Sequence, residues 1–240
     1  MVAFFSLLKK TFDCLRNSTT GYLVSLEFRL EGGKDFAMAT LDPVQAHDDS
    51  NHDPELLMSH PLQNKWTFWY YKPDKSLPWE QNLHKVTDFD TVEGFWALHN
   101  HIKPPSELQM GLDFNLFKEG IKPMWEDPSN IKGGKWVLNL DKRRRGPEND
   151  KLWLELVLSM IGELYDDDND DICGAVFQVR PKCERIAIWL GNTGNKEAVL
   201  RIGHKIKEFL ELPPKMIIVY EDHKDAANKT GSMAKNMFSI

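Results

Sequence analysis

The alternation of apolar and polar residues is dense from His60 onward and predicts a series of strands. The run 66–71, which reads WTFWYY, is rich in aromatic residues and is followed by Pro73, as is typical of a strand and its end. Five further stretches predict strands: 114–117, 136–140, 172–179, 185–190 and 216–220. Turn residues such as Gly133 and Gly134 lie between them, which indicates short, hairpin-like links.

Three stretches have helical periodicity instead. Thr91 is suited to capping a helix, and Pro104 is suited to stopping one. Between them, Val92, Phe95, Trp96, His99 and Ile102 recur at steps of three and four residues. Residues 150–165 and 195–210 predict two more helices. This order predicts an α+β domain, with a largely antiparallel sheet and its helices gathered on one face.

Residues 1–57 lack the dense alternation of apolar and polar residues that marks the rest of the chain. The stretch 42–55 is acidic, contains proline and is rich in histidine, as linkers often are. We therefore expect residues 1–57 to form a mostly disordered N-terminal extension and residues 58–240 to form the folded domain.

Charge and cysteine content narrow the classes of function. A net charge of −6 argues against a general nucleic-acid coat, so a nucleic-acid site must be small and locally basic. Cys14, Cys173 and Cys183 form no CxxC pair, which indicates neither a disulfide framework nor a zinc site. We expect a reducing, cytoplasmic location and no membrane association. The basic run 142–145 leaves a nuclear location open, although a solvated turn explains it more simply.

Eight tryptophans are the one excess in the composition. Six of them lie inside predicted elements, where burial is the expected environment: Trp66, Trp69, Trp96, Trp136, Trp153 and Trp189. Trp79 and Trp125 lie instead in polar loops that contain proline. For these two, exposure for binding and packing against a satellite core remain equally open.

Glu126, which follows Trp125, gives the second loop a chemical logic. A carboxylate can accept hydrogen bonds from the ring and amino N–H groups of guanine while an indole stacks on the base. A positive charge on the base adds a cation–π energy of roughly 0.5–2 kcal/mol for each indole. Arg180, Lys182 and Lys135 lie beside predicted strand ends, where they could neutralise phosphates. Taken alone, all four residues are ordinary surface charges.

The sequence lacks the signatures of a catalytic or metal site. No phosphate-binding glycine loop of the GxxxxGK type occurs, and no histidine triad or metal-ligating carboxylate cluster is found. The acidic run 166–171 lacks the glycine and the closing glutamate of a calcium loop, and it predicts a solvated loop. We expect no enzyme activity and no cofactor or metal.

The predicted helix 150–165 is apolar on more than one side. Its core stripe comprises Leu152, Trp153, Leu156, Val157, Met160 and Ile161. Leu154 and Leu158 add a second apolar strip beside Glu155. Such a helix is either completely buried or bound by a partner. We favour a partner that lays an amphipathic helix across it.

Longer motifs occur in a fixed order along the chain. They are HPLQNKW at 60–66, FDTV at 89–92, FW at 95–96, NHI at 100–102, PMWE at 123–126, GG at 133–134, WLE at 153–155, CGAV at 173–176 and IAIW at 186–189. Over about three quarters of the chain, this set resembles eukaryotic translation initiation factor 4E.

The resemblance implies a curved, largely antiparallel eight-stranded sheet backed by three helices on its convex face. On the concave face, this family binds the 7-methylguanosine 5′ cap of messenger RNA. Trp79 and Trp125 would clasp the base, Glu126 would bind the guanine edge, and Trp189 would contact the methyl group. The resemblance assigns the triphosphate to Arg180, Lys182, Lys135, Arg185 and Lys229.

On the convex face, the resemblance implies a binding surface for a helix with a Tyr-x4-Leu-hydrophobic motif. Such helices belong to the initiation factor 4G scaffold and to 4E-binding proteins. The matching residues are His60, Pro61, Val92, Trp96, Leu154, Glu155 and Leu158. Ser232 matches a regulatory phosphorylation site, so a phosphoprotein is expected. We expect a translation initiation factor that recruits the scaffold; the alternative is a cap-binding paralogue that represses translation by failing to recruit it.

Two departures from the family pattern bear on these expectations. Lys135 stands where arginine is more usual, which keeps the charge but loses the planar fork of donors. Gly94 replaces an acidic residue, which removes a charge near the expected partner surface and lowers helix propensity by up to about 1 kcal/mol.

Overall fold

A computed structural model describes residues 59–141, 145–227 and 237–240. The predicted extension 1–57, Lys229, Ser232 and three residues of the basic run 142–145 lie outside this range, so the expectations for them stay predictions. Across the described ranges, no helix combines the length and the apolar character that a membrane span needs.

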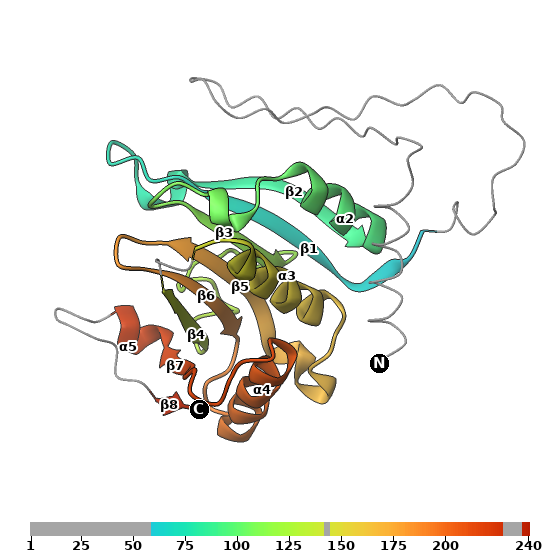
Figure 1. Ribbon diagram of the computed structural model, residues 1–240, viewed down its shortest axis with the longest axis vertical. Helices are drawn as coiled ribbons and strands as arrows, with labels where there is room; N and C mark the ends of the chain where they lie inside the picture. The colour runs from blue at the N-terminus through green and yellow to red at the C-terminus, as the bar shows by residue number, and fades with distance from the viewer. Residues whose placement is uncertain (1–58, 142–144, 228–236) are drawn as a thin grey trace, which may run out of the picture. The chain divides into compact units, whose positions relative to one another are not determined.

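Eight strands form one sheet in the order β2-β1-β3-β5-β6-β4-β7-β8 (Figure 1). They are β1 (Pro61–Tyr71), β2 (Leu83–Thr91), β3 (Asp113–Lys118), β4 (Gly134–Asp141), β5 (Ile172–Val179), β6 (Cys183–Leu190), β7 (Val219–Asp222) and β8 (Phe238–Ser239). From β1 across to β8, each neighbouring pair is antiparallel. The predicted, largely antiparallel sheet is confirmed.

The helices fall into two compact units of the chain. One unit contains residues 90–103 and with them α2 (Val92–His101). The other contains residues 63–89 and 104–240, with α3 (Pro147–Ile161), α4 (Lys196–Phe209) and the short α5 (His223–Ala227). Three 3-10 helices complete the elements: η2 (Trp79–Asn82), η3 (Pro105–Glu107) and η5 (Asp166–Asp171).

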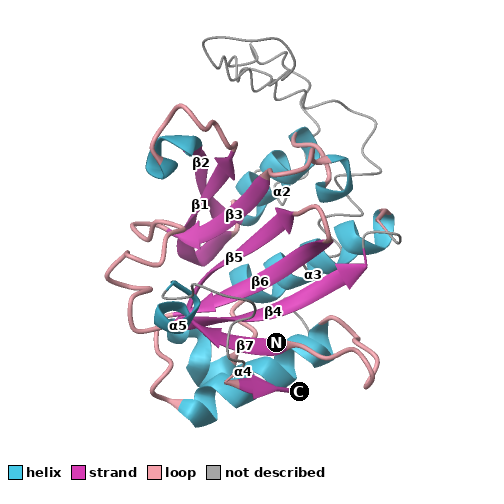
Figure 2. Cartoon of the chain, turned by 90° about the vertical axis from the view of Figure 1, so that its left-hand side faces the viewer, coloured by secondary structure: helices cyan, strands magenta, loops and turns pink. Residues whose placement is uncertain are grey.

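In the larger unit, α3 and α4 lie on one face of the sheet (Figure 2). The indole Nε1 of Trp136 on β4 donates to the carbonyl oxygen of Val199 on α4 at 2.9 Å. Trp153 on α3 packs edge-to-face on Phe177 of β5, with ring centroids 6.0 Å apart. Successive side chains along a strand point to opposite faces, so the residues between those that pack on α3 and α4 form the second face of the sheet. His223 of α5 packs on that second face, against Trp189.

The smaller unit is organised by the start of α2. The Thr91 hydroxyl accepts a hydrogen bond from the Gly94 N–H at 3.0 Å, which confirms the predicted cap. The His60 carbonyl accepts from the Val92 N–H at 2.9 Å. The His60 ring and its backbone N–H both contact the Glu93 carboxylate, at 2.6 and 3.1 Å. These contacts fix the first turn of the helix.

Three of the differences from the sequence predictions have clear physical reasons. Strand β2 was not predicted because its residues alternate poorly, and Phe89 is its one fully buried side chain. Helix α3 ends at Ile161 instead of residue 165, since Glu163 adopts a positive φ of 53°. The last long strand begins at Val219 instead of residue 216, where a turn closes from the Met216 N–H to the Pro213 carbonyl.

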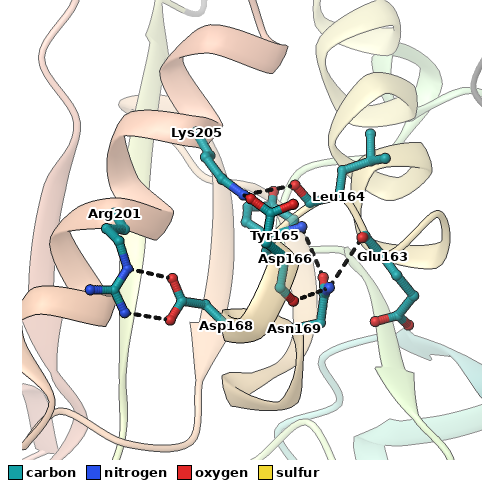
Figure 3. A network of polar contacts seen from close by, with 8 residues as sticks. All are labelled: Glu163, Leu164, Tyr165, Asp166, Asp168, Asn169, Arg201 and Lys205. Carbon is teal, nitrogen blue, oxygen red and sulfur yellow. Dashed lines mark hydrogen bonds and ion pairs between the residues drawn. The ribbon is translucent and has the colours of Figure 1, made fainter. Parts of the chain in front are cut away.

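The acidic run 166–171 forms the 3-10 helix η5, so the prediction of a loop is corrected, whereas Asp166, Asp167 and Asp170 are exposed to solvent as expected (Figure 3). Arg201 of α4 makes two hydrogen bonds to the largely buried Asp168, at 2.7 and 2.9 Å. Lys205 contacts Asp166 at 2.5 Å. The Asn169 side chain accepts from the Tyr165 N–H and donates to the carbonyls of Glu163 and Asp166 (Figure 3). The two cations on α4 and the Asn169 amide thus stabilise residues 166–171 against the mutual repulsion of their aspartates.

Gly203 tests the packing of α4 on the sheet. Alanine there would raise helix propensity by up to about 1 kcal/mol. Its Cβ, however, would lie 2.5 Å from Cζ2 of the buried Trp136 ring. Overpacking typically costs about 1–3 kcal/mol. We therefore expect Gly203→Ala to lower the free energy of unfolding, measured by chemical denaturation.

His204→Ala on the same helix is the matched control, because His204 is exposed and its replacement gains propensity without a clash. An unfolding free energy for Gly203→Ala at or above that of His204→Ala would contradict this packing.

Candidate functional site

The face of the sheet opposite α3 and α4 carries three cross-strand rows of side chains, which we call the row face. Residues that pair directly across neighbouring strands share a face. The first row is Tyr71, Asp113, Gln178, Arg185 and Asn139; the second is Trp69, Asn115, Val176, Ala187 and Val137; the third is Thr67, Phe117, Gly174, Trp189, Lys135 and Glu221. The first row is polar throughout, whereas the third combines two aromatic rings with charges.

Trp79 begins η2, in the loop between β1 and β2. Its side chain is 47% exposed, and its ring stacks on Tyr71 of the first row with centroids 5.6 Å apart. Asn82 closes this loop, since its buried side chain accepts from the Asp74 N–H and donates to the Asp74 carbonyl, at 3.0 and 3.1 Å. The loop is held without burial of the Trp79 indole.

Trp125 lies in the loop 119–133 between β3 and β4, and it is 38% exposed. Glu126 beside it is also exposed. The fully buried Asn130 donates to the carbonyls of Lys122 and Met124, both at 2.9 Å. Of the two alternatives for Trp79 and Trp125, exposure and packing against a satellite core, the structure shows exposure for both.

Trp189 lies at the centre of an aromatic cluster in the third row. Its ring packs edge-to-face on Phe117 at 5.5 Å and against His223 at 4.1 Å between centroids. The Lys135 ammonium lies 5.7 Å from the Trp189 ring centroid, within cation–π range. Burial lowers the pKa of His223 to about 3, and the charge of Lys135 adds to this shift. The imidazole is therefore neutral at physiological pH.

Gly133 links the Trp125 loop to the aromatic cluster around Trp189. Its N–H donates to the Asn130 carbonyl at 2.8 Å, and its own carbonyl accepts from the His223 N–H at 3.1 Å. A Cβ at this position would lie 1.7 Å from the Leu190 carbonyl oxygen. No side chain fits there, which explains why the turn requires glycine.

Four of the cationic residues predicted to bind phosphates lie in the described ranges, and they have three kinds of environment. Arg180 binds the buried Asp113 through two hydrogen bonds, at 2.5 and 2.8 Å. Arg185 and Lys182 are exposed at the same end of the β5–β6 hairpin. Burial lowers the pKa of Lys135, and its cross-strand neighbour Glu221 opposes that shift. The structure thus combines two accessible cations with two that the protein itself partly neutralises.

The predicted partner residues divide between the two units, and each set is described by itself. In the smaller unit, Pro61 is exposed and His60 is partly exposed, whereas Val92 and Trp96 are buried. On α3, Leu154 and Glu155 are partly exposed and Leu158 is buried. The second apolar strip of α3 is therefore half covered within the chain.

Sequence reasoning did not single out five residues that shape the row face and its loops: Tyr71, Asn82, Asp113, Asn130 and His223. The two asparagines had a usable signal, since short polar side chains near a loop end often close it by bonding backbone groups. Asp113 had none, because its partner Arg180 is 67 residues away in the chain. Across the ranges that the structure describes, no cluster of His, Cys, Asp or Glu could hold a metal ion.

Comparisons with known proteins agree with this arrangement. The family model for eukaryotic initiation factor 4E matches residues 61–238. A bovine protein (Bos taurus) named eukaryotic translation initiation factor 4E is 52% identical over 188 residues, which cover 78% of this chain and 87% of the relative. A human protein (Homo sapiens) named eukaryotic translation initiation factor 4E type 1B is 49% identical over 181 residues, 75% of either chain.

Solved structures show the same likeness. Ascaris suum eIF4E-3 in complex with an m2,2,7G cap has a TM-score of 0.71 and 48% identity, covering 76% of this chain and 99% of that one. C. elegans eIF4E-3 in complex with the 4E-binding protein Mextli and a cap analogue has a TM-score of 0.71 and 42% identity, covering 76% and 100%. The chain therefore belongs to the eukaryotic initiation factor 4E family.

Proposed function

We propose that this protein binds the 7-methylguanosine 5′ cap of messenger RNA on its row face and recruits the initiation factor 4G scaffold to start translation. It does so without catalysis, in the cytoplasm. The observation that carries the proposal is the exposure of Trp79 and Trp125 on two loops, each closed by a buried asparagine. Exposed indoles that the chain holds in place are suited to stack on a flat base.

The two tryptophan loops begin at opposite ends of the row face. The first and third rows lie four residues apart along each strand, or about 14 Å at ~3.4 Å per residue. Trp79 is anchored at the first row through Tyr71. Trp125 follows the end of β3 by seven residues, in a loop that turns back between the Ile121 N–H and the Lys118 carbonyl and that Asn130 closes. We propose that the base lies between the two loops, over the rows that separate them.

The charge on the methylated base sets the selectivity. Each indole face adds roughly 0.5–2 kcal/mol for a cationic base over a neutral one, so two faces correspond to about fivefold to several hundredfold tighter binding. Glu126 accepts from the guanine N–H donors, and the Trp125 backbone N–H donates to the guanine carbonyl. Trp189 contacts the methyl group from the third row.

The phosphates lie toward the first row. Arg185 and Lys182 offer exposed charges, Arg180 offers the donors that Asp113 leaves unused, and Lys135 acts from the third row. We include Lys229 in this set from the family pattern. Phosphorylation of Ser232 would add negative charge close to the ligand's own phosphates and weaken their attraction.

Ligands present in related structures support this assignment. Schistosome eIF4E has been solved with m7GpppA and a 4E-binding protein, and Ascaris suum eIF4E-3 with both an m7G and an m2,2,7G cap. These relatives are 36–48% identical to this chain.

The proposed partner is a helix with the Tyr-x4-Leu-hydrophobic motif, from the 4G scaffold or a 4E-binding protein. Leu154 and Glu155 supply an accessible apolar and acidic pair on α3. His60 and Pro61 supply accessible contacts in the smaller unit, and the buried Val92, Trp96 and Leu158 support the residues around them. An amphipathic helix is suited to each of these two sets, because its apolar residues recur on one side.

A cap-analogue titration tests the base site. We expect 7-methyl-GTP to quench tryptophan fluorescence, with unmethylated GTP requiring at least about fivefold more nucleotide for the same effect. Glu126→Gln should sharply reduce retention on cap resin, because an amide replaces the acceptor of two guanine donors. Equal quenching by the two nucleotides would contradict a slot that selects positive charge.

Glu119→Gln is the matched control for Glu126→Gln. Glu119 is an exposed carboxylate in the same loop, where it pairs with Lys65 at 2.8 Å. Exposed pairs contribute about 0–1 kcal/mol, so cap retention should stay unchanged.

A peptide with the Tyr-x4-Leu-hydrophobic motif tests the partner surface. Leu154→Ala should weaken its binding about fivefold or more, since truncation of an apolar anchor costs upward of about 1 kcal/mol. Glu148→Gln, at an exposed position of the same helix outside the partner residues, should not. Isothermal titration with and without cap analogue measures both. A wild-type chain that binds cap but not the peptide would fit a repressor and contradict scaffold recruitment.

A further inference from the structure

Asp113 places a negative charge inside the region that the proposed function assigns to phosphates. It begins β3, in the first row, and its side chain is 8% exposed. Burial raises the pKa of this carboxyl, while Arg180 and Gln178 oppose that shift through their hydrogen bonds. A buried anion beside a site for anions weakens phosphate binding by repulsion unless it has a second effect that outweighs this.

That second effect lies in the geometry of Arg180. A guanidinium carries five N–H donors in a fixed, planar fork. Nη1 donates to Asp113 Oδ1 and to the Val179 carbonyl, and Nη2 donates to Asp113 Oδ2. Nε and one hydrogen of Nη2 remain for a ligand. The orientation of these donors is fixed by the bidentate pair, because the fork cannot rotate without breaking it.

Asp113 is itself fixed from a second strand. Gln178 is its direct cross-strand neighbour on β5, and Gln178 Nε2 donates to Asp113 Oδ2 at 3.0 Å. The carboxylate therefore sits between an amide and a guanidinium, with three hydrogen bonds to its two oxygens. Rotation of its side chain would break all three.

We propose that Asp113 is a positioning residue for phosphate recognition, which holds Arg180 with two donors turned toward the phosphates. This inference rests on the proposed cap-binding function. It makes a prediction opposite in sign to simple electrostatics. Removal of the Asp113 charge makes the site more positive, which by Coulomb attraction alone would tighten binding of a triphosphate. Loss of positioning weakens it instead.

The test compares 7-methylguanosine, which has no phosphates, with 7-methyl-GTP on the full chain. The dissociation constant for 7-methylguanosine divided by that for 7-methyl-GTP measures the contribution of the phosphates to binding. In Asp113→Asn, we expect this ratio to fall about three- to tenfold, as one freed side chain must be immobilised on binding. The affinity for 7-methylguanosine should stay unchanged, which also shows that the variant folds. In an Arg180→Gln background, Asp113→Asn should add no further loss.

Asp166→Asn is the matched control, with the same change of charge at an exposed residue that pairs with Lys205 of α4. An unchanged or larger ratio in Asp113→Asn would overturn the proposal, as would an additive loss in the double variant. If Asp113→Asn also loses nucleoside binding, Gln178→Met decides, because it removes one hydrogen bond to Asp113 and should lower the ratio in the same direction. Failure of the proposed function has a different signature: the wild-type chain would not prefer methylated guanosine.

Discussion

Two buried asparagine side chains hold the loops on which the rest of the site depends. An indole that serves a ligand is not held by its own burial, so other groups must fix its loop. Asn82 and Asn130 do this from inside, with two backbone hydrogen bonds each. A typical hydrogen bond contributes about 0.5–1.5 kcal/mol, and a buried amide without partners costs more. The ordering entropy of the loops is thereby largely paid during folding, and it does not have to be lost again when a base binds.

The two-residue period of the strands separates stability from binding. Side chains that face α3 and α4 are large and apolar, as Trp136 and Phe177 show through their contacts with the helices. The neighbours of these residues point the other way and form the three rows. The rows also contain buried apolar residues such as Phe117 and Val176, so a substitution changes the ligand site without opening the core only at exposed row positions such as Arg185. On the opposite face, Gly203 and Trp136 tie the sheet to α4. This division lets one sheet carry charges and half-exposed rings on one side.

Local patterns predicted the elements, and tertiary contacts decided where they end. The Thr91 cap and strand β5 were found from sequence because both are encoded within a few residues. Strand β2 was missed because it is a half-exposed edge strand, in which apolar and polar residues do not alternate clearly. The acidic turn was misjudged because its counter-charges, Arg201 and Lys205, are 33 and 39 residues away. In the site, the tryptophans and Glu126 could be chosen from loop context, while Asp113 and His223 depend on partners that only the fold brings near.

The ligand proposed for this face carries charges of both signs, and the spacing of the rows keeps their recognition apart. The first and third rows are about 14 Å apart, beyond the Debye length of about 8 Å at physiological ionic strength. Exposed charges at one end therefore contribute little at the other, and the proposed contact of Trp189 with the methylated ring in the third row lies apart from Arg185 and Lys182 at the first. Buried charges are screened less. The buried Asp113 therefore reduces the positive charge that Arg180 presents to a phosphate. The partly exposed Glu221 does the same, more weakly, for its cross-strand neighbour Lys135.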